Sequence, residues 1–145
     1  MYTIGQVAKM YNLAPSTLRY YDKEGLFVNI NRTSGIRKFS QSDVETLRMI
    51  ECLKKTGMEI KEIKTFMQLC AMGSSTFPQR KKLFEERKKA VEADIEKLQK
   101  VLAMVEFKCW YYDKAIQDGT DDGVKAMLPD KLPKDIQQLY DVSHK

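Results

Sequence analysis

The segment APSTLRYYDKEGLF, residues 14–27, sets an arginine and two tyrosines directly after two hydroxyl side chains. A guanidinium forms paired hydrogen bonds with guanine in the DNA major groove, and hydroxyl groups bond phosphate oxygens. Pro15 suits the first turn of a helix and Gly25 suits its end. On that helix Leu18 and Tyr21 would face a core. The side chains left to face outward would be Ser16, Thr17, Arg19 and Tyr20.

A second short helix precedes this segment. The motif TIGQ at residues 3–6 is a capping box, which predicts a helix from about residue 4 to 10, followed by a tight turn. Two such helices form a helix-turn-helix, whose second helix enters the major groove. The alternative is structural: both tyrosines pack in a core, and Arg19 forms a surface ion pair with Asp22 or Asp43.

Residues 26–40 predict a β-hairpin. The apolar run Leu26–Ile30 and the segment IRKFS fit two short strands around the turn-rich NRTSG. A hairpin after a helix-turn-helix is a wing, and its cations would lie beside the DNA backbone and give salt-dependent affinity. These cations are Arg32, Arg37 and Lys38. A solvated loop is the alternative reading of the same residues.

Charge and composition narrow the class of protein. The net charge is +5, and residues 1–40 hold six cations against two anions, which favours a polyanionic partner. The sequence has no apolar run of about 18 residues and no secretion signal, so we expect a cytoplasmic protein. Paired carboxylates, a nucleophile beside a histidine and a glycine-rich phosphate loop are all lacking, so an enzyme is not predicted.

The middle of the chain predicts two further helices and then a long one. Ser40 and Asp43 form another capping box that opens a helix ending at Gly57, and the next helix ends near Gly73. Residues 77–118 contain no glycine, which allows one helix about 60 Å long. Its apolar side chains recur in heptads with one polar member. The seam consists of Phe84, Lys88, Val91, Ile95, Leu98, Leu102, Val105, Cys109, Tyr112 and Ile116. A stripe of this length needs a partner, most simply a second copy.

About the first 70 residues resemble the MerR family of transcriptional regulators. The resemblance rests on TIGQVAK, STLRYYDKEGL, SGIRKFS and LKKTGMEIKEI. It implies a mainly α fold with a winged helix-turn-helix and an antiparallel dimerisation helix. It also implies a homodimer that binds near-palindromic promoter DNA, distorts an overlong spacer and works with RNA polymerase. The DNA contacts would be Ser16, Thr17, Arg19, Tyr20, Arg37 and Lys38. Phe39 stands where many members have tyrosine, which removes a hydroxyl that could bond phosphate.

The expected division of the chain has three parts. Residues 1–73 would form the DNA-binding domain, residues 76–118 the coiled-coil dimerisation helix, and residues 119–145 a tail with a short helix from Lys134 to Val142. An adaptor whose basic head binds protein or RNA is the other class of protein that this arrangement allows.

The inducer has two candidate sites. Cys52 has cations nearby in the sequence and resembles the single reactive cysteine of the aldehyde- and electrophile-responsive branch; the alternative is a small packed cysteine. Four aromatic residues near the chain's end could bind an aromatic or cationic molecule, or could simply cap the dimer seam. They are Phe107, Trp110, Tyr111 and Tyr140. Residues 117–145 lack the cysteine pair of metal-sensing members and the only histidine is His144, so neither a metal nor another cofactor is predicted.

Overall fold

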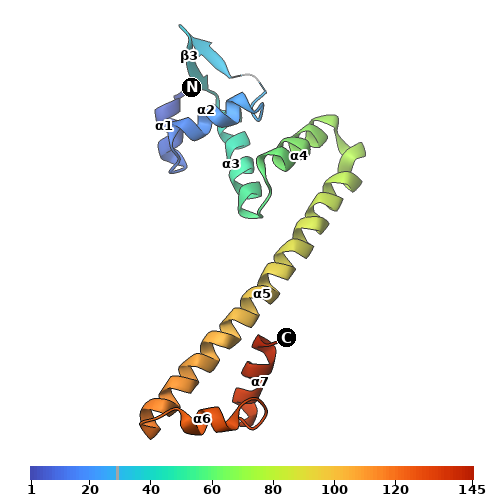
Figure 1. Cartoon of the computed structure of the whole chain (residues 1–145). Helices are drawn as coiled ribbons and strands as arrows, with labels where there is room; N and C mark the ends of the chain where they lie inside the picture. The colour runs from blue at the N-terminus through green and yellow to red at the C-terminus, as the bar shows by residue number, and fades with distance from the viewer. Residues whose placement is uncertain (29) are drawn as a thin grey trace. The chain divides into compact units, whose positions relative to one another are not determined.

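The structure is a computed structural model that describes residues 1–28 and 30–145. These residues form two compact units, residues 1–88 and residues 89–145. We call the first unit the head. The long helix α5, Phe77–Asp118, contributes residues 77–88 to the head and continues into the second unit (Figure 1).

The first two helices of the head begin and end as the local sequence predicts. Helix α1, Ile4–Met10, starts with a complete capping box, in which the Thr3 hydroxyl accepts from the Gln6 amide and the Gln6 side chain accepts from the Thr3 amide. Helix α2, Pro15–Lys23, has its proline in the first turn. The chain leaves α2 through Gly25, whose φ of +81° favours glycine.

The sheet of the head has three strands rather than the two expected of a hairpin. Strands β2, Asn31–Thr33, and β3, Ile36–Phe39, form the wing, and β1, Tyr2–Thr3, pairs with the other side of β3 in the order β1-β3-β2. All pairs are antiparallel.

The first strand of the wing lies later in the chain than we expected. The run Leu26–Ile30 was predicted as a strand, but β2 begins at Asn31, and Asn29 lies outside the described residues. Leu26 and Phe27 are buried in the core of the head. An apolar run indicates burial, and here a loop supplies the buried residues.

Two longer helices complete the head. Helix α3, Gln41–Lys55, opens with the Ser40–Asp43 capping box, and helix α4, Ile60–Met72, follows after the turn at Gly57. A short 3-10 helix, Ser74–Thr76, leads into α5. The core of the head is one cluster whose buried residues come from α1, α2, β3, α3, α4 and the loops between them, including the fully buried Leu18, Phe39, Leu47, Ile50 and Ile63.

The second unit folds its tail back on the end of α5. Helix α6, Asp122–Met127, was not predicted, whereas α7, Lys134–Ser143, confirms the expected tail helix. Both lie beside the last turns of α5, drawn in orange and red in Figure 1, around a small core that includes Phe107, Val124 and Leu132. Among the described residues, no helix has both the length and the apolar character needed to cross a membrane.

Candidate nucleic-acid interface

Helix α2 presents the two faces that the sequence predicts. Leu18 and Tyr21 are buried in the core of the head. On the other face Ser16, Arg19 and Tyr20 are exposed, and Thr17 is half-buried. A cationic side chain and two hydroxyl groups therefore stand free on the helix that would read DNA bases.

Tyr21 joins α2 to α3 through a polar network at the edge of the core. Its hydroxyl donates to Glu51 Oε1 at 3.1 Å and accepts from Lys54 Nζ at 2.5 Å. Burial raises the pKa of Tyr21, and the hydrogen bond to Tyr21 raises the pKa of Lys54. Tyr21 stays neutral and Lys54 stays charged near pH 7, so this bond holds α2 in place on α3.

Asp22 joins the wing to α2. Arg37 Nε donates to Asp22 Oδ2 at 2.8 Å, and Arg32 lies 3.5 Å from the same oxygen. Among residues 1–28 and 30–145, no ion pair of Arg19 is found, so the alternative pairing of Arg19 with Asp22 or Asp43 is wrong. The wing arginines hold Asp22, which leaves Arg19 available.

A groove runs between the exposed face of α2 and the wing. Residues of both elements line it: Ser16, Arg19, Tyr20, Asp22, Lys23, Glu24, Arg32 and Arg37. Four of the six residues assigned to DNA contact therefore lie around one groove. Of the other two, Thr17 is on the same helix, and Lys38 is half-buried on β3.

A second hollow adjoins Tyr20 and brings in two cations that sequence reasoning did not select. Lys61 and Lys64, in the first turns of α4, line it together with Tyr20 and Glu59. Their spacing of three residues on a helix was the signal available, since it places both side chains on one face.

Phe39 has a structural role in the head. Its side chain is fully buried and meets Phe27 edge to face, with ring centroids 5.7 Å apart. The residue that departs from the pattern of the resembled family is thus accommodated as part of the core.

The cysteine proposed as a sensor is accessible. Cys52 is exposed on α3, so the alternative reading of Cys52 as a packed core residue is wrong. Cys109, on α5, is exposed as well, and Cys70 is half-buried. In the part of the chain that the structure describes, no group of three or more His, Cys, Asp or Glu residues is arranged to hold a metal ion.

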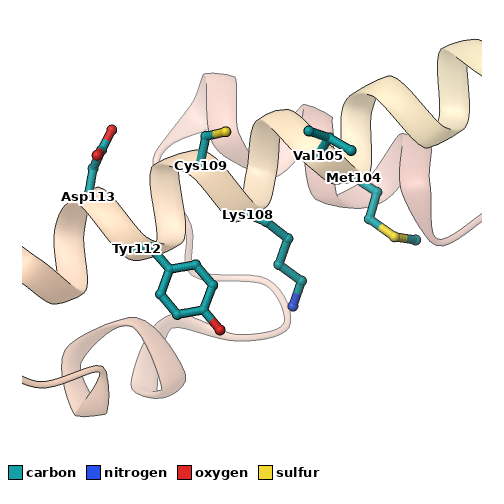
Figure 2. Close-up of a pocket in the computed structure, with 6 residues that line it drawn as sticks. All are labelled: Met104, Val105, Lys108, Cys109, Tyr112 and Asp113. Atoms are coloured by element: carbon teal, nitrogen blue, oxygen red, sulfur yellow. The ribbon is translucent and has the colours of Figure 1, made fainter.

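The apolar stripe of α5 lies open beyond residue 88. We call this stripe the free face of α5, and it consists of Val91, Ile95, Leu98, Leu102, Val105, Cys109, Tyr112 and Ile116, all exposed. Leu98 is 67% exposed. Figure 2 shows a concave part of this region, where Val105, Cys109 and Tyr112 project from successive turns beside Met104, Lys108 and Asp113.

The four aromatic residues assigned to an effector pocket pack on one another. Phe107 is the centre: its ring lies 6.3 Å from Trp110, 6.2 Å from Tyr111 and 5.3 Å from Tyr140. The Tyr111 hydroxyl also donates to Asp121 Oδ2 at 2.6 Å, which raises the pKa of Tyr111 to about 12. This packing favours the structural reading, and the effector pocket stays a prediction.

Comparison with known proteins agrees with this geometry. The family described as MerR HTH family regulatory protein matches residues 2–70, and the family described as MerR, DNA binding matches residues 44–106. An uncharacterised HTH-type transcriptional regulator of Haemophilus influenzae is 37% identical over 92% of this chain and 97% of its own length.

Two solved structures are also similar. HiNmlR, described as a MerR family regulator lacking the sensor domain and bound to promoter DNA, has a TM-score of 0.66 at 37% identity, covering 84% of this chain and 98% of that one. A MerR family regulator from Bacillus thuringiensis has a TM-score of 0.60 at 43% identity, covering 74% of this chain and 96% of that one. With a winged helix-turn-helix, a long helix and relatives that align over nearly their whole length, this chain belongs to the MerR family of transcriptional regulators.

Proposed function

We propose that the chain binds near-palindromic promoter DNA as a homodimer and regulates transcription by distorting the spacer of that promoter. The observation that carries the proposal is the groove between α2 and the wing, where Ser16, Arg19 and Tyr20 are free of the core. The similar protein HiNmlR was solved bound to promoter DNA, which supports the same partner for this chain. Arg19 would contact bases, and the wing cations, Arg32, Arg37 and Lys38, would contact phosphates.

The homodimer is supported by the free face of α5. Apolar side chains exposed at heptad spacing over several turns are typical of a helix that packs on another helix. A second copy of the chain supplies a matching stripe, and a two-fold pair carries two copies of α2, which suits an operator with two related half-sites.

Selection of bound sequences from a random duplex library, using the purified full chain, tests DNA reading. We expect a near-palindrome with a long spacer. Arg19→Ala should weaken operator binding about 5- to 150-fold and relax the base preference at one position of each half-site. Lys9→Ala, a change of equal charge on α1, is the control. If no sequence is enriched, the proposed reading of bases by α2 is wrong.

We further propose that an electrophile is sensed at Cys52. In the simplest case the Cys52 sulfur adds to the carbonyl carbon of an aldehyde and the thiol proton passes to the carbonyl oxygen, giving a hemithioacetal without any oxidant. The exposure of Cys52 and the neighbouring cations Arg48, Lys54 and Lys55 support this role.

A reporter promoter tests this step. Cys52→Ala should abolish the response to an added aldehyde while DNA binding is kept, and Cys109→Ala, which removes the other exposed cysteine, should respond normally. A full response from Cys52→Ala would end the proposal and leave the aromatic cluster of the second unit as the place to search for an effector.

A further inference from the structure

The first turns of α5 carry a stripe that contacts the head, in which Arg80, Leu83 and Arg87 are half-buried and Phe84 is 40% exposed. Arg80, Leu83, Phe84 and Arg87 recur at the spacing of one helix face. Leu83 packs on the core of the head, and the Phe84 ring meets Phe66 of α4 edge to face at 5.3 Å. Phe84, which the heptad pattern assigns to the dimer seam, thus has a partner within its own head.

Arg80 closes the end of α4. The last carbonyls of a helix have no partner within it, and the last turn of α4 contains no basic residue of its own. The Arg80 guanidinium donates to the carbonyl oxygens of Gly73 at 2.7 Å and Leu69 at 3.3 Å. Its Nε donates to the hydroxyl of the buried Thr76 at 2.9 Å, and that hydroxyl also contacts both carbonyls.

Arg87 does the same for α3, two turns further along α5. Its Nε donates to the carbonyl oxygen of Thr56, the residue that caps α3, at 3.0 Å. Gly57 makes room for this contact, because a Cβ added at Gly57 would run into the Arg87 guanidinium. Two arginines of α5 therefore hold the ends of the last two helices of the head.

Helix α3 connects these contacts to both proposed sites. Tyr21 of α2 bonds Glu51 and Lys54 in the last turns of α3, and Cys52 lies between those two residues. The end of α3 is thus held both by the helix that would read DNA and by Arg87 of α5.

We propose that Arg80 and Arg87 are positioning residues that fix the direction in which α5 leaves the head, and that promoter distortion depends on them while DNA binding by the head does not. This inference rests on the proposed promoter distortion. A dimer can impose a shape on DNA only if each head is rigid on its dimerisation helix, and two charged contacts placed two turns apart resist both bending and rotation.

The test compares Arg80→Gln and Arg87→Gln, singly and together, with Lys81→Gln and Lys82→Gln in the full chain. Each single change removes one positive charge from the first turns of α5, the double arginine variant is compared with the double lysine variant, and Lys81 and Lys82 are exposed. Operator affinity should match the controls within about twofold. Bending of a doubly labelled operator, measured by energy transfer, and transcription from the promoter should fall at least about fivefold in the arginine variants only.

Distance measurement separates failure of this inference from failure of the proposed function. The direction of α5 is reported by the distance between two spin labels, one at Glu45→Cys on α3 and one at Glu92→Cys on α5. The native cysteines are replaced by serine, and unlabelled chain is added in excess so that distances are measured within one chain. The double arginine variant should broaden the distance distribution and the lysine variants should not. An unchanged distribution overturns the proposal even if the wild type bends no DNA. Equal losses in arginine and lysine variants overturn it as well.

A glycine pair covers the case in which the arginine variants fail to fold. Gly57→Ala should displace Arg87 and broaden the distance distribution. Gly119 has a similar φ, and a Cβ added there meets no atom within 4 Å. Gly119→Ala should therefore cost similar backbone strain and leave the distance distribution narrow. In an Arg87→Gln background Gly57→Ala should broaden it no further. The proposal would be contradicted if Gly57→Ala and Gly119→Ala broadened the distance distribution equally. It would also be contradicted if the broadening by Gly57→Ala and by Arg87→Gln were additive.

Discussion

Leucine side chains are buried in the head and exposed on the free face of α5. Leu47 in the head is 0% exposed, whereas Leu98 on α5 is 67% exposed. The head surrounds its apolar residues with helices from its own chain, and the free face has no such cover among the described residues. The head therefore has a buried core of its own, and the long helix beyond it has the composition of an interface.

The surroundings of the apolar stripe change along helix α5. Up to Arg87 the stripe contacts the head, because Leu83 packs on its core and Phe84, although 40% exposed, meets Phe66 of α4. From Val91 onward the stripe is open. The heptad spacing continues across this boundary, where its one polar member, Lys88, lies, so the spacing alone does not tell which partner a given turn will have.

A charge on the free face should have the largest effect. Leu98→Glu is expected to raise the dissociation constant of the dimer about 100-fold or more, because an unpaired buried carboxylate costs about 3–5 kcal/mol. Sedimentation velocity of the full chain measures this. Ala93→Glu adds the same charge elsewhere on the exposed part of α5 and should leave the dimer intact. If both variants remain dimeric, the free face is not the interface.

Truncating leucine to alanine should have very different effects in the head and on the free face of α5. Leu47→Ala should lower the free energy of unfolding by about 2–5 kcal/mol, because it leaves a cavity in the core of the head. Leu98→Ala should change it by less than about 0.5 kcal/mol at concentrations where the chain is monomeric. Urea denaturation followed by circular dichroism gives both values. Similar losses would mean that Leu98 is covered within a single chain.

A smaller effect is expected where the wing joins α2. Asp22→Asn should destabilise the head by about 1 kcal/mol or less, because its partly exposed ion pairs with Arg32 and Arg37 are screened by water. The released arginines should strengthen non-specific DNA binding and steepen its salt dependence. Glu24→Gln, an exposed acid on the edge of the same groove, should leave stability unchanged. Thermal unfolding and salt titrations of DNA binding separate the two variants.

The smallest effect concerns pH and the second unit. The bond to Asp121 raises the pKa of Tyr111 from 10.0 to about 12, so its stabilising effect is complete below about pH 10 and is lost as pH rises toward about 12. In Tyr111→Phe, thermal stability should fall less between about pH 10 and about pH 12 than in the unmodified chain. Tyr112→Phe, which changes the exposed neighbour, should leave the fall unchanged. Tyrosinate absorbance would follow the titration. A Tyr111 that titrates near pH 10 would contradict the bond.

The sequence predicts those parts of the fold that depend on neighbouring residues. The capping box of Thr3 and Gln6, with Pro15 and Gly25, predicted α1 and α2, because these signals act within one turn of backbone. The outward position of Arg19 and the inward position of Tyr21 followed from helical spacing alone.

The parts that were missed depend on contacts between distant residues. Strand β1 has only two residues, too few to show a period, and it exists because β3 offers it hydrogen-bonding partners. The partners of Asp22 could not be predicted, because several cations lie at similar distances along the chain and tertiary geometry selects among them. The carbonyl contacts of Arg80 and Arg87 leave no pattern in the sequence at all.

The docked start of α5 has a consequence for building hybrid regulators. A graft that joins this DNA-binding module to a foreign coiled coil at Gly73, where the last helix before α5 ends, would discard Arg80 and Arg87 together with the surface they hold. A junction after Lys88 keeps both, and the compact unit ends at the same residue. The number of residues between the module and the new coil would then set the angular phase of the graft, at about 100° per inserted residue.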